Sequence, residues 1–314
     1  MRRKIVKQGH NTLTITLPAQ WCKKNNVVPG DEVNILDDNT SALKIVKDGP
    51  IEEKKEVFFK LDSLGRYALA KMIMSYFELG YDLITIDISQ NNIKSWSHGE
   101  EDVQKAVSFF VSRLLGYEIV MQDNDTIKIT NILEKNSEFM SLISKMFVLL
   151  EENVRIFSMN AMETKQDLKF HSDTFHDAIT RLTSLVLRAL NQNKQLSSVE
   201  LSSYYAIVFI IDKCGDFLRY LYKDIQERNF SHELKKILDS TKEYIHMMHN
   251  FFNKYSLEKV NELDNLRGVI TKSGLALKTE ERDFAAQLHL LVELVQGIIK
   301  ERIKLELNGS SKVE

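Results

Sequence analysis

The chain of 314 residues is poor in the residues that break or cross-link a fold, with two cysteines, three prolines and twelve glycines. Cys22 and Cys214 lie far apart and have no CxxC or Cys/His spacing, so neither a disulfide framework nor a zinc site is indicated. Abundant Leu, Ile, Lys and Glu favour long helices over a β protein with many turns. We expect a mostly helical protein in a reducing compartment.

Long hydrophobic runs are also missing. The longest, YYAIVFII at residues 204–211, ends at Asp212 and is much shorter than the roughly 18 residues of a membrane span. Residues 12–17 alternate polar and apolar side chains, unlike the continuous apolar region of a signal peptide. We therefore expect a cytoplasmic protein without membrane insertion.

Carboxylates are absent from the first thirty residues, which hold six Lys and Arg before Asp31. Residues 1–48 carry eight basic and five acidic residues, whereas the whole chain has a net charge of −2, so the remainder is acidic. Lys and Arg contact DNA phosphates, and nearby carboxylates weaken such contacts. The segment therefore predicts a DNA-binding surface, with an ordinary solvated lysine-rich terminus as the alternative.

Residues 1–48 read as a small β unit. IVKQ, TLTITL, EVNIL and ALKIV are short β-branched segments, Pro18 opens the helical turn AQWCKKNN, and PGDE turns the chain back into a strand. A unit of fewer than about 50 residues without disulfide or metal usually needs a partner to complete its core. We expect a homodimer through this unit.

The run GHNTLTITLPAQWCKKNNVVPGDEVNIL resembles the AbrB/SpoVT/MazE family, whose motif is a strand ending in Pro, a short helix, PGDEV and a closing strand. The resemblance implies a swapped-hairpin β-barrel dimer that grips double-stranded DNA, or an antitoxin-like partner protein. In place of the usual strand arginines stand Thr12, Thr14 and Thr16, so base-specific readout is not implied. By position, the implied DNA-binding residues are Arg2, Arg3, Lys4, Lys7, His10, Asn11, Lys23 and Lys24.

The middle segment, residues 57–133, predicts a small α/β module. Helices are expected at 61–79 and 101–115, closed by Gly80 and Gly116, with strands YDLITIDI, YEIVM and TIKIT. It has no glycine-rich phosphate loop and no His/Cys/Asp constellation. The sequence predicts no chemistry for this module.

Residues 134–306 predict an antiparallel bundle of five or six helices, followed by a polar tail at 307–314. Start signals stand at Asn136, at Ser197 with Glu200 as a capping box, at Ser231 and at Thr279. Two apolar stripes predict its core: Leu168, Phe175, Ile179, Leu182, Val186 and Ala189, then Ile207, Ile211, Cys214, Leu218, Tyr222 and Ile225.

Two pairs of aspartates stand at a spacing of four, Asp173 with Asp177 and Asp212 with Asp216. Like charges at this helical spacing cost about 0.2–0.5 kcal/mol per pair unless they are neutralised. All four lie more than about 100° from the apolar stripe of their helix, on an outer or lateral face. Either they are solvated or they offer oxygen ligands to a hard cation such as Mg, Ca or Mn. Gly215, costly by about 1 kcal/mol inside a helix, suggests a close approach.

The stretches IDKCGD and DTFHDAITRL resemble the two motifs of the phosphate-uptake regulator PhoU, over roughly residues 134–306. The resemblance implies three-helix bundles that bind iron or zinc on their outer face, a role in phosphate homeostasis, and a phosphate ABC transporter or sensor protein as partner. The implied ligands are Asp173, Asp177, Asp212 and Asp216, with His171 and His176 close enough in sequence to add nitrogen. The second half keeps Glu258, Glu262 and Glu293 but has Gly297 in place of an aspartate, so one cluster is expected.

Together these patterns predict a multidomain, mostly α protein of the α+β class: a transcriptional regulator that binds DNA and carries a metal-binding helical module as sensor or docking site. We expect binding without catalysis. A carboxylate-cluster metalloenzyme is the alternative, but the sequence shows no nucleophile and no inward acid/base pair. The ExxH formed by Glu243 and His246, with His249 after it, is most simply an ordinary amphipathic helix.

Overall fold

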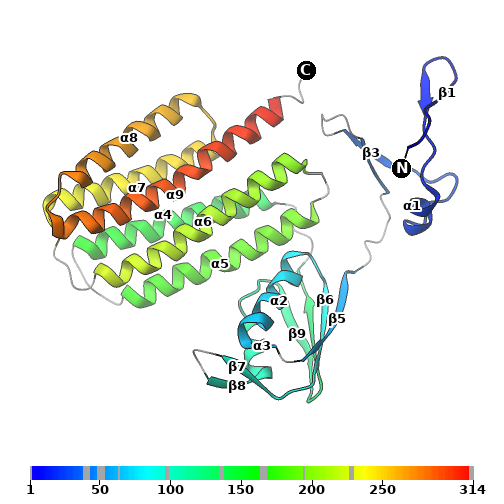
Figure 1. Ribbon diagram of the computed structural model, residues 1–314, viewed down its shortest axis with the longest axis horizontal. Coiled ribbons are helices and arrows are strands. Elements are labelled where there is room, and N and C mark those ends of the chain that lie inside the picture. The colour runs from blue at the N-terminus through cyan, green and yellow to red at the C-terminus, as the bar shows by residue number, and fades with distance from the viewer. Residues whose placement is uncertain are drawn as a thin grey trace. The chain divides into compact units, whose positions relative to one another are not determined.

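The computed structural model describes residues 2–37, 43–47, 54–62, 64–95, 99–133, 138–162, 168–193, 195–225 and 230–310. The chain divides into two compact units, Met1–Glu53 and Lys54–Glu314. As expected, most described residues are helical (Figure 1). Asn136 and the last four residues of the polar tail lie outside the described residues. Among the residues described, no helix is long and apolar enough to cross a bilayer.

The N-terminal unit has two antiparallel hairpins and one short helix. β1 (Val6–Gln8) pairs with β2 (Thr12–Thr14), α1 spans Ala19–Lys24, and β3 (Asn34–Asp37) pairs with β4 (Leu43–Val46). Gly9 turns the first hairpin with a φ of 77°. The order of strands and helix is as predicted. The described residues of one copy form two separate two-stranded sheets, so the swapped barrel stays a prediction about the dimer.

The predicted PGDE turn is present and closed by hydrogen bonds. The backbone N–H of Val28 donates to Asp31 Oδ2 at 2.9 Å, and the N–H of Asp31 donates to the Val28 carbonyl at 3.1 Å. Gly30 supplies the left-handed φ of 97° that such a turn requires. Lys47 Nζ contacts Asp31 Oδ2 at 2.6 Å, which ties the turn to the second hairpin.

Unit Lys54–Glu314 begins with a four-stranded sheet of order β5-β6-β10-β9. β5 (Glu56–Leu61) runs parallel to β6 (Leu83–Ile88), and the pairs β6 with β10 (Thr126–Asn131) and β10 with β9 (Tyr117–Gln122) are antiparallel. α2 (Arg66–Glu78) and α3 (Val103–Val111) supply the buried side chains that cover one face of the sheet. On the other face the side chains that alternate with the buried ones are partly or fully exposed.

Two features of this layer differ from the sequence prediction. Residues 56–61 form strand β5, so the helix predicted from Leu61 begins only at Arg66. A small hairpin of β7 (Asn92–Ser95) and β8 (Gly99–Asp102) precedes α3, which begins at Val103 because the Asp102 side chain accepts a hydrogen bond from the Lys105 N–H at 3.0 Å. Short apolar runs such as VFFKL do not distinguish strand from helix, which explains the first error. The second arose because the helix was predicted to begin at Glu101, whereas Asp102 is its N-cap.

Six long helices follow: α4 (Phe139–Met162), α5 (Leu168–Gln192), α6 (Ser198–Ile225), α7 (His232–Asn253), α8 (Leu257–Leu275) and α9 (Thr279–Ser310) (Figure 1). α4, α5 and α6 pack together, as do α7, α8 and α9, and the two sets join along α6–α9 and α4–α7. The predicted capping box is confirmed, since Glu200 N–H donates to Ser197 Oγ at 3.2 Å and Ser197 N–H to Glu200 Oε2 at 2.8 Å. Ser231 caps α7 through the Leu234 N–H at 3.2 Å.

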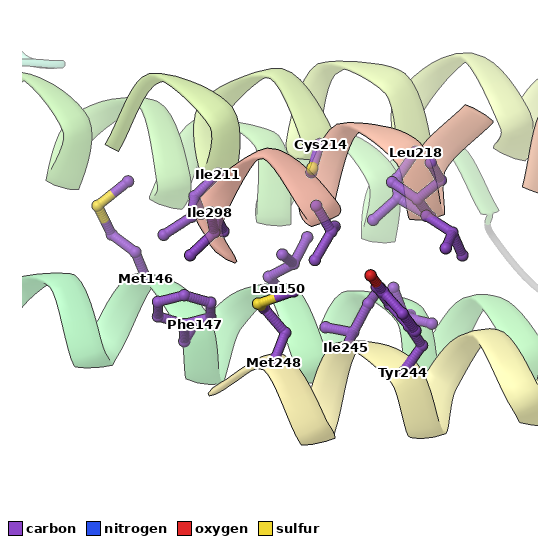
Figure 2. Close-up of a cluster of buried hydrophobic side chains, with 14 of the residues drawn as sticks. Met146, Phe147, Leu150, Ile211, Cys214, Leu218, Tyr244, Ile245, Met248 and Ile298 are labelled. Carbon is purple, nitrogen blue, oxygen red and sulfur yellow. The ribbon is translucent and has the colours of Figure 1, made fainter. Parts of the chain in front are cut away.

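The bundle core follows the two predicted stripes to different extents. All six side chains of the α6 stripe are buried. On α5, Ile179, Val186 and Ala189 are buried, Phe175 and Leu182 are partly exposed, and the Leu168 side chain lies outside the described residues. Figure 2 shows Ile211, Cys214 and Leu218 of α6 facing α4 and α7 side chains. Burial raises the pKa of the Cys214 thiol, which therefore stays protonated as a packing residue.

The α/β layer joins the bundle through a polar contact between α2 and α5. Arg188, buried on α5, donates to the carbonyls of Phe77 at 2.9 Å and Tyr81 at 2.7 Å, and to Asp82 Oδ1 at 2.8 Å. Asn191 donates to the Glu78 carbonyl at 2.8 Å. These groups add donors from α5 to the carbonyls of the last two residues of α2 and to that of Tyr81, which follows the helix. The layer and the bundle have separate hydrophobic cores, and the boundary predicted near residue 134 stays a prediction.

Candidate DNA-binding surface and carboxylate seam

Every residue predicted to contact DNA is exposed. His10 and Asn11 form the tip of the β1–β2 hairpin beside Gly9, and Lys23 and Lys24 end α1. Cations in the last turn also suit the helix dipole, so Lys23 and Lys24 need no ligand to explain them. Six of these side chains make no ion pair or hydrogen bond with any residue in the described part of the chain: Arg2, Arg3, Lys4, Lys7, Lys23 and Lys24.

The β1–β2 hairpin has two unlike faces. Cross-strand partners share a face, so the register puts Lys7 with Leu13 on one side and Gln8 with Thr12 on the other. Thr14 lies on the Thr12 side, where its Oγ1 donates to the Val6 carbonyl at 3.1 Å. The hairpin thus separates a threonine face, rich in hydroxyl groups, from a face that carries Leu13.

Among the side chains of this unit that the structure describes, which do not include those of residues 36, 37, 44 and 46, none is buried. Leu13 is 68% exposed, as much as a loop residue, although it lies in a strand. Folded domains bury their apolar side chains, and a unit of this size has little area of its own to do so. The apolar side chains left exposed are Ile5, Val6, Leu13, Ile15, Val28, Ile35 and Leu43.

The second group of candidates is the carboxylate seam, which we define as Asp173 and Asp177 of α5 with Asp212 and Asp216 of α6. Each carboxylate contacts a basic side chain. Asp173 accepts from Arg219 Nε at 2.8 Å, and Asp177 accepts from both terminal nitrogens of Arg113 at 3.1 and 2.5 Å. The aspartates therefore lie on the lateral side of the helices, as predicted, with their charges compensated.

The other half of the seam is held by Lys213 and His176. Lys213 Nζ lies 2.5 Å from Asp216 Oδ2 and 3.2 Å from Asp212 Oδ2. His176 Nε2 lies 2.8 Å from Asp216 Oδ1, and His176 Nδ1 lies 3.3 Å from Asp177 Oδ1. Both ring nitrogens therefore face a carboxylate, which bridges α5 to α6.

These contacts set the ionisation of two seam carboxylates. Partial burial opposes ionisation of Asp177, but hydrogen bonds and charge from Arg113 and His176 hold the pKa of its carboxyl below the usual value. Burial acts on Asp216 in the same way, and Lys213 and His176 lower its pKa. Hydrogen bonding to Asp216 in turn raises the pKa of Lys213. At neutral pH the seam is a network of ion pairs.

The bearing of these contacts on metal binding is limited. In the part of the chain that the structure describes, no group of three or more His, Cys, Asp or Glu side chains is placed to hold a metal ion. Carboxylate oxygens and the His176 nitrogens are chemically suited to iron or zinc. Any such ion would compete with Arg113, Lys213 and Arg219 for the oxygens, and the metal site stays a prediction.

Gly215 marks a close approach, as predicted, but the approaching group is apolar. A Cβ at Gly215 would lie 3.2 Å from Ile179 Cδ1 on α5. On α9, a Cβ at Gly297 would likewise lie 3.0 Å from Ile210 Cδ1 of α6. Both glycines let neighbouring helices pack closely, so neither indicates a ligand.

Of the carboxylates expected in the second half, Glu293 has a basic partner. Arg267 contacts Asp264 at 2.8 Å and Glu293 at 2.9 Å. His249 Nδ1 lies 2.7 Å from Glu151 Oε1, and its ring stacks on Phe147. Glu151 was missed because it lies on α4, distant in sequence. Arg113 was missed for the same reason, whereas the i, i+3 spacing of Lys213 and Asp216 could have predicted their ion pair.

Comparison with known proteins gives one match. The family described as antidote-toxin recognition MazE, bacterial antitoxin, matches residues 6–53. No curated protein and no solved structure matched the chain. The match spans β1 to β4 and supports the predicted resemblance of the N-terminal unit, which makes DNA binding or an antidote function the coarse assignment. The PhoU resemblance of residues 134–306 has no comparable match and stays a prediction.

Proposed function

We propose that the protein is a DNA-binding regulator whose N-terminal unit pairs with that of a second copy and holds double-stranded DNA. The observation that carries this proposal is the family match at residues 6–53, on a unit with free exposed cations and no buried residue among the side chains that the structure describes. Unit Lys54–Glu314 acts as the sensor or docking module. The protein acts by binding and not by catalysis.

Pairing of two N-terminal units follows from the exposed apolar side chains. Covering Ile5, Leu13 and Ile15 removes apolar surface from water at about 25 cal/mol per Å². A two-fold arrangement uses the same surface of both copies and so satisfies both. It also doubles the number of unpaired cations, and each phosphate contact releases condensed counterions.

The test replaces Arg2, Arg3, Lys4 and Lys7 with Ala and titrates duplex DNA by fluorescence anisotropy at several salt concentrations. We expect weaker binding and a shallower salt dependence, by about 0.9 in the log–log slope for each phosphate that the variant no longer neutralises. The control removes four exposed lysines of the second unit and changes net charge equally: Lys236, Lys272, Lys278 and Lys300. Equal affinity and slope in the N-terminal variant and the wild type would exclude the DNA assignment.

An antidote function is the second candidate, because the matched family is itself described as a bacterial antitoxin. In this case unit Lys54–Glu314 would neutralise a toxic protein partner. Co-expression with the product of an adjacent gene distinguishes the two. If the variant with Arg2, Arg3, Lys4 and Lys7 replaced still rescues cells from growth arrest by that gene product, the antidote function is favoured over DNA regulation.

The link to phosphate and to iron or zinc rests on the sequence resemblance alone, as does partnership with a phosphate ABC transporter or sensor protein. Elemental analysis of the purified protein tests the metal directly. With Asp173→Asn and Asp216→Asn, metal content and the melting temperature in added iron or zinc should both fall. Absence of metal from the wild type, together with an unmoved melting temperature, would leave the seam as ion pairs only.

A further inference from the structure

Strand β5 is an unprotected edge of the four-stranded sheet. It lies at the end of the order β5-β6-β10-β9 and keeps an unbroken parallel register with β6 over six residues. No strand in the described part of the chain pairs with its other side, and EVFFKL contains no Pro or Gly. The opposite edge is irregular, because the β10–β9 register shifts between Lys128 and Ile129. Bulges, prolines and charged side chains are the usual protection of an edge; β5 has no bulge or proline, and its charged residues are Glu56 and Lys60.

The side chains of β5 are free to contact another chain. Glu56, Phe58 and Lys60 point away from α2 and α3 and are exposed, Phe58 by 66%. Glu56 and Lys60 make no ion pair with any residue that the structure describes. On the helix side, Phe59 is partly exposed and stacks on Tyr76 at 5.7 Å between ring centroids. An edge strand this apolar is a template for pairing.

The strand is complementary to itself when it is reversed. In an antiparallel pair centred on Phe58, Phe58 meets its own copy, and Glu56 meets Lys60 of the second chain on the same face. Val57 meets Phe59 on the helix side. Aromatic pairs and opposite charges are favourable cross-strand partners, and like charges are unfavourable. A parallel pair in register would instead oppose Glu56 with Glu56 and Lys60 with Lys60.

We propose that β5 pairs antiparallel with β5 of a second copy, centred on Phe58, so that two four-stranded sheets become one continuous sheet. The inference rests partly on the proposed N-terminal dimer, which tethers the two β5 strands. Nine residues separate Val46 from Glu56 and span at most about 30 Å. Such a tether provides an effective concentration in the millimolar range, enough to form a pairing that free units would not.

The test uses the full chain with Cys22→Ser, where the remaining Cys214 is fully buried. Phe58→Cys should form a disulfide-linked dimer under mild oxidation, resolved on a non-reducing gel. The matched control is Glu118→Cys, exposed on the opposite edge strand β9. In the Phe58→Cys chain, Glu56→Lys alone and Lys60→Glu alone should each slow cross-linking by about threefold to tenfold. The double swap Glu56→Lys with Lys60→Glu restores opposite charges and should restore the rate.

Light scattering of the wild type and its DNA titration separate the possible failures. A dimeric, DNA-binding protein in which Phe58→Cys cross-links no faster than Glu118→Cys overturns β5 pairing and leaves the proposed function intact. A double swap that stays as slow as the single swaps overturns the antiparallel register. If the wild type is monomeric and the Phe58→Cys chain forms no cross-link, both β5 pairing and the N-terminal dimer are overturned.

Discussion

Arg188 is the residue on which the contact between the α/β layer and the bundle depends. Its side chain is 5% exposed, bonds two carbonyls and Asp82, and stacks on Phe77 and Tyr117. Arg188→Met removes the buried guanidinium that pairs with Asp82 Oδ1, so the free energy of unfolding should fall by about 3 kcal/mol. The carbonyls of Phe77 and Tyr81 keep other donors, the Gly80 N–H and the Tyr117 hydroxyl. Urea unfolding followed by circular dichroism measures the decrease.

Arg219→Ala is the matched control for this prediction, because Arg219 also pairs with an aspartate but its side chain is 46% exposed. Exposed pairs contribute less than about 1 kcal/mol. Arg188→Lys should also destabilise, since an ammonium cannot reproduce the planar fork of a guanidinium. If Arg188→Met and Arg219→Ala lower the free energy of unfolding equally, the buried contact of Arg188 stabilises the protein no more than an exposed ion pair does.

Glu78 gives the protein a predictable pH dependence. Burial against α5 raises the pKa of its carboxyl, and the charge of Asp212 adds to this, while a hydrogen bond from Ser184 and the charge of Lys71 oppose it. A raised carboxyl pKa in the folded state means that the folded state binds the proton more tightly. Stability contributed by this group is therefore lost as pH rises above the ordinary Glu value of 4.5.

Glu78→Gln removes that pH-dependent penalty while keeping an oxygen for Ser184. The variant should be more stable than the wild type at pH 7, and the difference should shrink as pH falls toward 4.5. Glu152→Gln provides a control of opposite sign, because hydrogen bonding from Arg155 lowers the pKa of Glu152. Thermal unfolding at a series of pH values measures both. If the stability difference between Glu78→Gln and the wild type does not change with pH, the raised pKa of Glu78 is contradicted.

Residue-level prediction from sequence succeeded where the interaction is local. Ser197, Glu200 and Ser231 were identified because a cap and its partner lie three residues apart. Arg188 was not identified, because its acceptors lie more than one hundred positions earlier in the chain. The four aspartates were placed correctly on a lateral face, but the basic partners Arg113 and Arg219 depend on which helices are neighbours.

At the scale of the element, substitutions at two glycines inside helices should have opposite effects on the stability of the protein. A Cβ at Gly268 on α8 meets nothing within 4 Å, so Gly268→Ala should stabilise by about 0.5–1 kcal/mol through helix propensity. Gly215→Leu on α6 would push against Ile179 and should destabilise by about 1–3 kcal/mol. Melting temperatures of the two variants provide the measurement. A stabilised Gly215→Leu protein would show that α5 and α6 can move apart freely.

The elements themselves were predictable in proportion to their length. The long helices and their starts follow from the 3.6-residue period and from caps, and the α6 stripe is buried as predicted. Strand β5 was missed because VFFKL is apolar enough to fit the start of a helix. The partial exposure of Phe175 and Leu182 on α5 could not be predicted, since it depends on which helices pack against α5.

At the scale of the whole molecule, the two units should differ in how stability depends on concentration. None of the side chains described in the N-terminal unit is buried, whereas Lys54–Glu314 has extensive cores. If pairing completes the first unit, a tenfold dilution should lower its melting temperature by about 5 °C and shift that of the second unit, which has its own cores, much less.

Tryptophan fluorescence can follow the first unit alone. In a Trp96→Phe chain, Trp21 is the remaining tryptophan and reports on α1. Circular dichroism reports mainly on the helices of the second unit. A Trp21 transition that does not move between the two concentrations would show that the N-terminal unit folds without a partner.

The lack of a buried residue among the side chains described in the N-terminal unit also has a consequence for the order of folding. On the ribosome this segment emerges before residues 54–314, and domains usually fold in the order in which they are made. A segment that must meet a second chain cannot follow that order. If pairing completes this segment, it waits while the bundle behind it folds and is completed only at the rate at which finished chains encounter one another. The N-terminal unit, although made before residues 54–314, would then mature after them. A cell making few copies would accumulate chains in which the second unit is folded and the N-terminal unit is not yet complete.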